Sequence, residues 1–333
     1  MSEPQSPGRF VVVRDAGANL DWPGLERLDR PVVAIGNFDG VHRGHRSVIG
    51  TAIQRAEAAR RPAAVLTFEP HPRTFFHPEE PSFHLSSEAA KLRLLAATGI
   101  DGTIILTFNA ALAGHSAEAF VQEILVERLA ITGAVIGFNF HFGKHRRGTP
   151  DFLAAQGAQH GFSVDVVPPF QYQGRRVSSG AVRDALTAGH VTEATELLGY
   201  PYFVTAQVEH GDKRGRTLGY PTANLRLGAD CGLRHGIYAV RVGVGGVRYD
   251  GVASFGRRPM FDTGAVLLEI FLFDFAGDLY GAALDCAFIG WIRPEMNFDS
   301  VEDLIRRMDQ DCSQARHLLA RAPDAFPVLG SPG

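Results

Sequence analysis

Gly36-Asn37-Phe38-Asp39-Gly40-Val41-His42-Arg43-Gly44-His45 is the stretch of the sequence that decides the fold. It follows the apolar run 31–35, which is typical of a buried strand, and it precedes a segment with helical periodicity over about 44–60. Three glycines in ten positions let the backbone approach a ligand closely, and the helix start offers N–H groups and a positive dipole end. The stretch therefore predicts a strand-to-helix turn that binds a phosphate.

Two histidines lie three residues apart in this turn, with Gly44 between them. His42 and His45 would sit together at the helix start, where they could hydrogen-bond the oxygens of a nucleoside triphosphate. A surface turn with two incidental histidines is the plain alternative. A zinc site is the other alternative, although no third ligand lies nearby at metal spacing.

The composition is that of a soluble globular protein long enough for two domains. The chain has 333 residues, of which 45% are hydrophobic and 21% charged, with a formal net charge of −3. This net charge does not indicate a basic surface that would bind nucleic acid. Three scattered cysteines argue against a disulfide framework and favour a cytoplasmic location. Neither a secretion signal nor a membrane-spanning apolar run is present, so no membrane partner is expected; a homo-oligomer stays open.

Strand-like and helix-like segments alternate in the first half of the chain. The strand candidates are 32–37, 63–68, 102–108, 134–138 and 162–167, and the helix candidates between them are 44–60, 87–98, 116–129 and 150–161. Such alternation predicts a doubly wound parallel sheet with helices on both faces. Ligands of these sheets bind beyond the carboxyl ends of the strands, which is where the 36–45 turn falls.

Three further polar clusters, at 69–73, 138–148 and 178–183, follow strands. The second combines aromatic rings, Asn139 and four basic side chains, which suits a flat ring carrying a phosphate, although a solvated basic loop is the alternative. The third, beginning Ser178-Ser179, predicts a serine cap that opens a helix. Ser179 and Arg183 are four residues apart and could face the same triphosphate, unless they are a plain cap and a surface arginine.

A change of pattern at 199–201 indicates a second domain. Helical segments 178–188 and 191–198 lead to this break, and short strands then recur at 202–209, 236–244, 248–254, 266–275 and 283–291. A final helix begins near residues 299–300 and carries one apolar stripe. We therefore expect one domain at 1–199 and a second at 200–325, the second being a small antiparallel barrel packed against a C-terminal helix.

The chemical motif of the second half is 211–224, Gly-Asp-Lys-Arg-Gly-Arg-Thr-Leu-Gly-Tyr-Pro-Thr-Ala-Asn. Its glycines and basic side chains could cradle phosphates, and the oxygens of Thr222 and Asn224 are hard ligands suited to Mg²⁺. It is not a Walker loop, because no Gly-Lys-Ser/Thr ending opens a helix. A polar hairpin is the alternative.

Glu269 is the other informative residue of this half. Alternation along 266–275 makes both faces of the strand apolar apart from Glu269, so one carboxylate is expected to lie in an apolar surface. Such burial is costly unless the group is paired or functional, and it suits a general base. A structural ion pair with Arg293 or Arg257 is the alternative.

Taken together, these motifs resemble those of the prokaryotic bifunctional riboflavin kinase/FAD synthetase family. The 36–45 turn and the late Ser-Ser…Arg helix start are similar to the nucleotidylyltransferase superfamily, and the clusters at 68–73 and 139–148 resemble segments of the family's adenylyltransferase half. The stretch 215–224, Glu269, and the segments 256–259, 274–281 and 293–298 resemble its flavokinase domain. The resemblance spans about residues 31–316.

The resemblance implies a Rossmann-like α/β domain, followed by a small antiparallel β-barrel with a C-terminal helix. It implies a transferase that phosphorylates riboflavin to FMN in the C-terminal domain and adenylylates FMN to FAD, releasing pyrophosphate, in the N-terminal domain. ATP would be the co-substrate and Mg²⁺ the metal.

The motifs and the resemblance together indicate four sets of site residues. The catalytic set is Glu269, His42, His45 and Arg183. The ATP-binding set is Gly36, Phe38, Asp39, Gly40, Ser178, Ser179, Gly211, Arg216, Gly219 and Pro221. The flavin-binding set is Asn139, Arg293 and Phe298, and the metal-binding set is Thr222 and Asn224.

Four positions depart from the residues usual in the family. Gly180 stands where a threonine is usual and removes a hydroxyl from the ATP site, and Ser254, Met260 and Phe271 stand where asparagine, threonine and histidine are common. A degenerate flavin-binding regulator and a transferase for a different mononucleotide are the alternative functions. The joint presence of the histidine pair, Glu269, Thr222 and Asn224 argues against degeneracy.

Overall fold

The computed structural model describes residues 10–15, 22–80, 83–209, 220–256 and 266–323. The chain divides into two compact units, one of Met1–Ser82 with Lys91–Val177 and one of Phe83–Ala90 with Ser178–Gly333. The two helices that directly precede residue 199 group with the second unit. A functional border at residues 199–200 stays a prediction.

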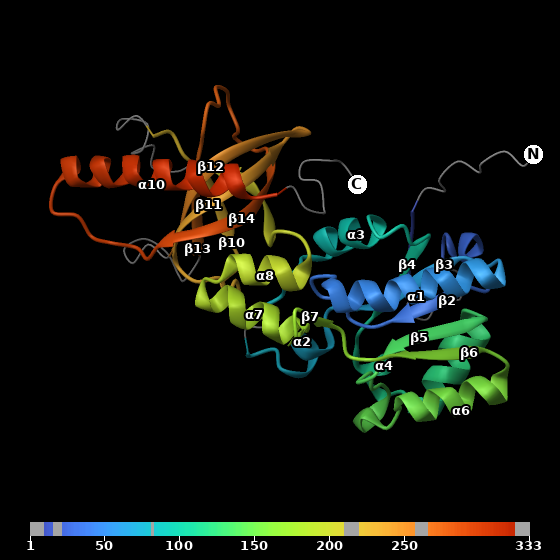
Figure 1. The fold of residues 1–333 in the computed structure, drawn as a ribbon. Helices are drawn as coiled ribbons and strands as arrows, with labels where there is room; N and C mark the ends of the chain where they lie inside the picture. The colour runs from blue at the N-terminus through green and yellow to red at the C-terminus, as the bar shows by residue number, and fades with distance from the viewer. Residues whose placement is uncertain (1–9, 16–21, 81–82, 210–219, 257–265, 324–333) are drawn as a thin grey trace, which may run out of the picture. The chain divides into compact units, whose positions relative to one another are not determined.

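The first unit is built on a six-stranded parallel sheet in the order β1-β4-β3-β2-β5-β6 (Figure 1). Its strands are β1 (Val11–Arg14), β2 (Val32–Ile35), β3 (Ala63–Glu69), β4 (Gly102–Thr107), β5 (Gly133–Gly137) and β6 (Ser163–Val167). From β2 the chain winds outward through β3 and β4, and it returns to the other side of β2 with β5. The predicted fold class is confirmed, and the 36–45 turn follows the strand where the winding direction reverses, which is where such sheets bind ligands.

Helices cover both faces of this sheet, as predicted. One face packs against the π-helical segment η2 (Phe120–Arg128) and α6 (Pro150–His160). α1 (Arg43–Ala59) contacts β2, β3 and β5 with the buried side chains Val48, Ile49 and Ala52. The shorter helices are η1 (Leu25–Leu28), α2 (Pro72–Phe76), α3 (Glu88–Ala96), α4 (Ala110–Gly114), α5 (Ala117–Ala119) and η3 (Lys144–Arg146), and β7 (Gln171–Tyr172) pairs with β8 (Arg175–Arg176) in a hairpin.

The unit contains elements that were not predicted, and two differences can be explained. β1 was not predicted, because four residues of alternation give too short a signal; it forms by pairing with β4 at the sheet edge. The helix expected over 116–129 is α-helical only at α5 and continues as η2. Apolar spacing predicted a helix here, but it does not separate an α-helix from a π-helix.

The second unit contains a closed antiparallel barrel in the order β10-β13-β12-β11-β14-β9. The strands are β9 (Phe203–Glu209), β10 (Ala223–Leu227), β11 (Gly236–Val244), β12 (Val247–Gly256), β13 (Val266–Leu272) and β14 (Ala283–Arg293), preceded by α7 (Ser179–Ala188) and α8 (Val191–Leu198). The predicted barrel is confirmed. β10 is the strand that the sequence did not reveal, because it begins inside the motif interpreted as a phosphate-binding loop.

The C-terminal helix α10 (Val301–Arg321) packs on the outside of the barrel against β11, β12 and β14 (Figure 1). Ser300 caps its first turn by accepting a hydrogen bond from the Asp303 N–H at 3.1 Å. At its other end the buried Arg241 donates to the carbonyl oxygens of Leu319, Ala322 and Pro323 at 2.8–3.0 Å. A cation from the barrel thus lies at the C-terminal end of the helix, where the helix dipole favours positive charge.

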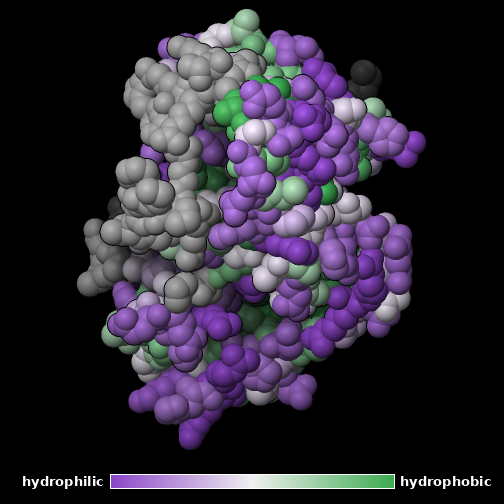
Figure 2. All heavy atoms as spheres, turned by 90° about the vertical axis from the view of Figure 1, so that its left-hand side faces the viewer, coloured by the Kyte–Doolittle hydropathy of each residue, from purple (hydrophilic) through white to green (hydrophobic). Residues whose placement is uncertain are grey.

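Hydrophilic side chains dominate the face of the molecule shown in Figure 2. Within the described ranges, no helix is both long enough and apolar enough to span a bilayer.

Candidate active sites in the two units

The turn between β2 and α1 has a strained backbone that burial holds in place. Phe38, Gly40 and Val41 have φ angles of 49°, 77° and 34°, in the left-handed region that a β-branched residue such as Val41 rarely adopts. Phe38 is only 1% exposed, and Val41 and Asp39 are also buried. A loosely packed surface turn would relax from these conformations, so the surrounding packing must fix this one.

The two histidines form a stacked pair at the N-terminus of α1. His42 is the N-cap, and its Nδ1 accepts a hydrogen bond from the His45 N–H at 3.1 Å. The ring centroids are 3.6 Å apart with an interplanar angle of 13°. A Cβ at Gly44 would lie 3.2 Å from the His42 ring, so glycine suits this crowded position. Because Nδ1 accepts, a neutral His42 ring carries its proton on Nε2, where it is a donor suited to a phosphate oxygen.

Two neighbouring segments of the first unit flank this turn. The guanidinium of Arg43 lies 4.4 Å from the ring centroid of Tyr172 in the β7–β8 hairpin. Asn139 is exposed just after β5, the strand paired with β2, so it lies at the same edge of the sheet as the turn. The turn and Asn139 thus follow adjacent strands of the sheet.

A cluster of phenylalanines follows strands of the same sheet. The Phe108 ring makes edge contacts with Phe68, Phe75 and Phe76 at 5.4–6.1 Å between centroids, and Phe76 is 58% exposed. Sequence reasoning identified the aromatic loop after β5 but missed this second cluster. The pattern Phe75-Phe76 was visible, but nothing local showed that Phe108 would meet it.

Ser178, Ser179 and Arg183 belong to the second unit. Ser178 is the predicted N-cap of α7 and accepts from the Ala181 N–H at 3.2 Å, and Arg183 Nε donates to the carbonyl oxygen of Phe83 at 2.5 Å. His42 and His45 belong to the first unit. Binding of one triphosphate by His42, His45, Ser179 and Arg183 together therefore stays a prediction.

Three polar residues line up across the outer face of the barrel. Asn224 on β10 lies directly opposite Glu269 on β13, and Glu269 lies directly opposite Ser254 on β12. The residues that flank Glu269, Leu268 and Ile270, are fully buried inside the barrel, so Glu269 faces outward and is half-buried. The strand alternation expected around Glu269 is present. Strand pairing in the barrel also places Asn224 and Ser254 next to Glu269, which the sequence did not predict.

Asn224 has the properties of a ligand residue. It is 7% exposed, its Nδ2 donates to the Thr222 carbonyl oxygen at 3.4 Å, and its buried Oδ1 has no hydrogen-bond partner in the described part of the chain. A cavity of about 320 Å³ is lined by Asn224, Thr222 and Pro221 together with the turn 275–280 after β13. A buried acceptor without a partner is costly, so this oxygen is suited to a cation or a donor from a ligand.

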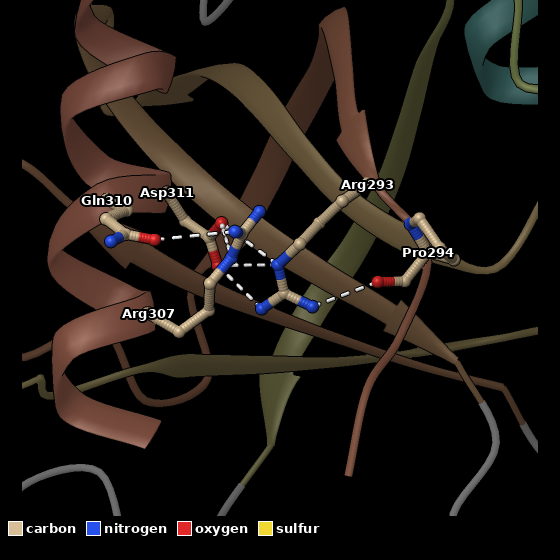
Figure 3. A network of polar contacts seen from close by, with 5 residues as sticks. All are labelled: Arg293, Pro294, Arg307, Gln310 and Asp311. Atoms are coloured by element: carbon tan, nitrogen blue, oxygen red, sulfur yellow. Dashed lines mark hydrogen bonds and ion pairs between the residues drawn. The ribbon is translucent and has the colours of Figure 1, made fainter. Parts of the chain in front are cut away.

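Arg293 is held in a buried network at the end of β14. Its guanidinium donates to Asp311 on α10 and to the carbonyl oxygen of Pro294 (Figure 3), and it lies 5.8 Å from the ring centroid of Phe298. Arg293 therefore forms an ion pair with Asp311. A structural ion pair at Glu269 stays the alternative to the general base. Arg257, Gly211, Arg216 and Gly219 lie outside the described residues.

Zinc binding was the alternative for the histidine pair His42 and His45. Among the described residues, no group of three or more His, Cys, Asp or Glu side chains could hold a metal ion.

Comparison with known proteins covers both units. The family model for FAD synthetase matches residues 25–181, and the model for riboflavin kinase matches residues 198–319. A bifunctional riboflavin kinase/FMN adenylyltransferase of Pseudomonas fluorescens is 40% identical over 290 residues, which are 87% of this chain and 93% of the relative. A bifunctional riboflavin kinase/FMN adenylyltransferase of Listeria monocytogenes is 36% identical, and the match covers 91% of this chain and 96% of the relative.

A solved structure described as a macrolide-efflux protein of Streptococcus pneumoniae has the same fold. It superposes with a TM-score of 0.81 at 30% identity, covering 92% of this chain and 99% of the streptococcal chain. The resemblance found in the sequence is confirmed: the chain belongs to the bifunctional riboflavin kinase/FMN adenylyltransferase family, with its FAD synthetase region N-terminal to its riboflavin kinase region.

Proposed function

We propose that the second unit phosphorylates riboflavin to FMN with ATP and that the first unit joins AMP from a second ATP to FMN, giving FAD and pyrophosphate. The observation that carries the proposal is the pairing of Glu269 with Asn224, a residue that lines the cavity, because it places a candidate metal ligand next to a candidate base on rigid strands. Family membership supports both reactions. A cytoplasmic location, where ATP is available, completes the proposal.

In the kinase reaction Glu269 is the general base. It accepts the proton of the 5′-hydroxyl of the ribityl chain as that oxygen attacks the γ-phosphorus of ATP, and the bond from the γ-phosphorus to the β–γ bridging oxygen breaks to release ADP. A carboxylate on a strand is well suited to this role, because its backbone is fixed on both sides by β10 and β12. Pro221 would contact the nucleotide, together with Gly211, Arg216 and Gly219.

Asn224 and Thr222 are the residues that would hold Mg²⁺. The fit rests on the partnerless Oδ1 of Asn224 and on the hard oxygen donors that both side chains offer at the cavity. Bound there with the phosphates, Mg²⁺ would neutralise charge that develops on their oxygens.

In the adenylyltransferase reaction no base is needed. A phosphate oxygen of FMN attacks the α-phosphorus of ATP directly, the bond from the α-phosphorus to the α–β bridging oxygen breaks, and pyrophosphate leaves. His42, His45 and the N-terminus of α1 would neutralise the triphosphate, with Ser178, Ser179 and Arg183 as further donors. The glycines of the turn, Phe38 and Asp39 would shape the ATP site.

Flat apolar rings need flat apolar surfaces. In the first unit, the phenylalanines around Phe108 and the amide of Asn139 would hold the isoalloxazine ring of FMN. In the second unit, Phe298 with the supporting Arg293 would hold that of riboflavin.

The test is incubation of the purified chain with riboflavin, ATP and Mg²⁺, followed by chromatographic separation of the flavins. The proposal requires that FMN appears first and FAD later. Supplied FMN should give FAD without riboflavin. A chain that binds flavin but forms neither product would be the degenerate regulator, and one that adenylylates another mononucleotide in preference to FMN would be the alternative transferase.

A further inference from the structure

All three nitrogens of the Arg293 guanidinium donate hydrogen bonds within the protein (Figure 3). Nε donates to both oxygens of Asp311 at 3.0 and 3.1 Å, Nη2 donates to Oδ2 of Asp311 at 2.7 Å, and Nη1 donates to the Pro294 carbonyl oxygen at 2.9 Å. These bonds fix the orientation of the guanidinium. We therefore expect Arg293 to contribute to flavin binding through the residues that it holds in place.

Asp311 is the residue that makes this arrangement rigid. Its side chain is 5% exposed and accepts from two arginines, Arg293 and, at 3.2 Å, Arg307 one turn earlier on α10. A buried ion pair of this kind contributes little net stability, because desolvation offsets most of the attraction. Its bidentate geometry does fix orientation.

The segment that this pair holds is 294–300, which leads from β14 to α10. The bond to the Pro294 carbonyl oxygen fixes its first peptide, and the Arg293 guanidinium lies beside the Phe298 ring. Glu295 lies between Pro294 and Phe298 in the sequence, and its carboxylate lies against Gly256 on β12. A Cβ atom at position 256 would clash with this carboxylate. Partial burial, together with the charge of Glu269, raises the pKa of Glu295, so this segment also lies near the proposed base.

We propose that Asp311 is a positioning residue for riboflavin binding: by locking Arg293, it holds Phe298 and the 294–300 segment in the conformation that receives the isoalloxazine ring. The inference rests on the proposed function of the second unit. Asp311 touches no substrate, and its effect on the kinase reaction is transmitted through Arg293.

The test is Asp311→Asn in the full chain, which keeps the side-chain volume and removes the charge that orients the guanidinium. We expect the KM for riboflavin to rise about 10-fold, while kcat and the KM for ATP stay within about twofold. The matched control is Asp303→Asn, the same change in an exposed ion pair of α10 with Arg306 at 3.0 Å, which should leave the KM for riboflavin unchanged. FAD formation from supplied FMN reports on the integrity of the first unit in the same samples.

A second measurement separates positioning from a general structural role. If Asp311 acts through Phe298, then adding Asp311→Asn to Phe298→Ala should raise the riboflavin KM by less than about twofold. A general loss of structure would instead lower kcat, and the KM of the double variant would show the full effect of both substitutions. A folded Asp311→Asn chain with unchanged riboflavin KM would overturn the inference, as would full additivity.

Arg293→Lys decides the question if Asp311→Asn lacks a folded barrel, as judged by circular dichroism. Lysine keeps the charge but loses the planar fork, so the KM for riboflavin should rise, and an unchanged KM would overturn the inference. Failure of the proposed function looks different. In that case the unmutated chain would form no FMN from riboflavin, and both the proposed kinase function and the role of Asp311 would be wrong.

Discussion

The two candidate ATP sites are built in different ways, and the difference follows from the nucleophile each must use. In the first unit, one ten-residue turn supplies stacked histidines and a helix N-terminus, all of which favour negative charge. In the second unit, a carboxylate and an amide lie opposite each other on strands far apart in the sequence. The phosphate of FMN is already an anion and needs only charge stabilisation, whereas the hydroxyl of riboflavin must lose a proton.

Replacing the proposed base should have the largest effect. Glu269→Gln keeps the volume and hydrogen-bonding reach of the side chain but removes the basic oxygen, so FMN formation should slow by about 10²–10⁴-fold. ATP binding to the second unit and FAD formation from supplied FMN should stay near normal. Steady-state rates with each flavin substrate check this. Unchanged turnover per folded molecule would show that both sites work by charge stabilisation alone.

Removing one histidine should affect only the other reaction. His45→Ala deletes a proposed donor to the triphosphate, and loss of one such donor costs about 2.7–4 kcal/mol in the barrier, or about 10²–10³-fold in rate. The rate of FAD formation from FMN measures the loss, and the rate of FMN formation from riboflavin is the control. If both rates fell together, the two sites would not be independent.

Arg241→Gln should test how far the barrel depends on its helix. The change removes charge-assisted hydrogen bonds to the last carbonyls of α10, each worth about 1.5–3 kcal/mol, so the free energy of unfolding of the second unit should fall by at least that much. Urea unfolding followed by loss of kinase activity gives this quantity. FAD formation from FMN should persist at urea concentrations that abolish FMN formation. Equal loss of both activities would contradict separate stabilities.

The smallest effect should appear only at alkaline pH. The Tyr220 hydroxyl donates to Asp309 Oδ1 on α10 at 2.5 Å, and this bond, together with partial burial, raises the pKa of Tyr220 to about 12. A folded-state pKa above the unfolded value of about 10 contributes stability that is complete below pH 10 and is lost as the pH rises through 12.

The stability of the second unit should therefore fall more steeply over this range in the unmutated chain than in Tyr220→Phe. Urea unfolding at pH 9 and at pH 11.5 makes the comparison. Parallel losses in the two chains would show that the bond between Tyr220 and Asp309 does not contribute.

The sequence by itself predicted the strand-to-helix turn at 36–45 and the fold class of both units. The 36–45 turn could be interpreted because its strand, glycines, histidines and helix are contiguous, so local periodicity and spacing carry the information. The same holds for Ser178 as a cap and for the final helix after Ser300. Local signals of this kind depend on neighbours within a few residues, which the sequence displays directly.

Only the tertiary structure decided how the candidate residues of the second unit pair. Nothing near Asn224 indicates that it lies opposite Glu269, because that pairing arises when β10 adds to β13 to close the barrel. The same is true of Arg293, which the sequence indicated as a flavin contact and which Asp311, eighteen residues later, holds as an ion-pair partner. Strand register and buried charge pairing are set by which surfaces the whole chain can bury together, and no short stretch of sequence contains that information.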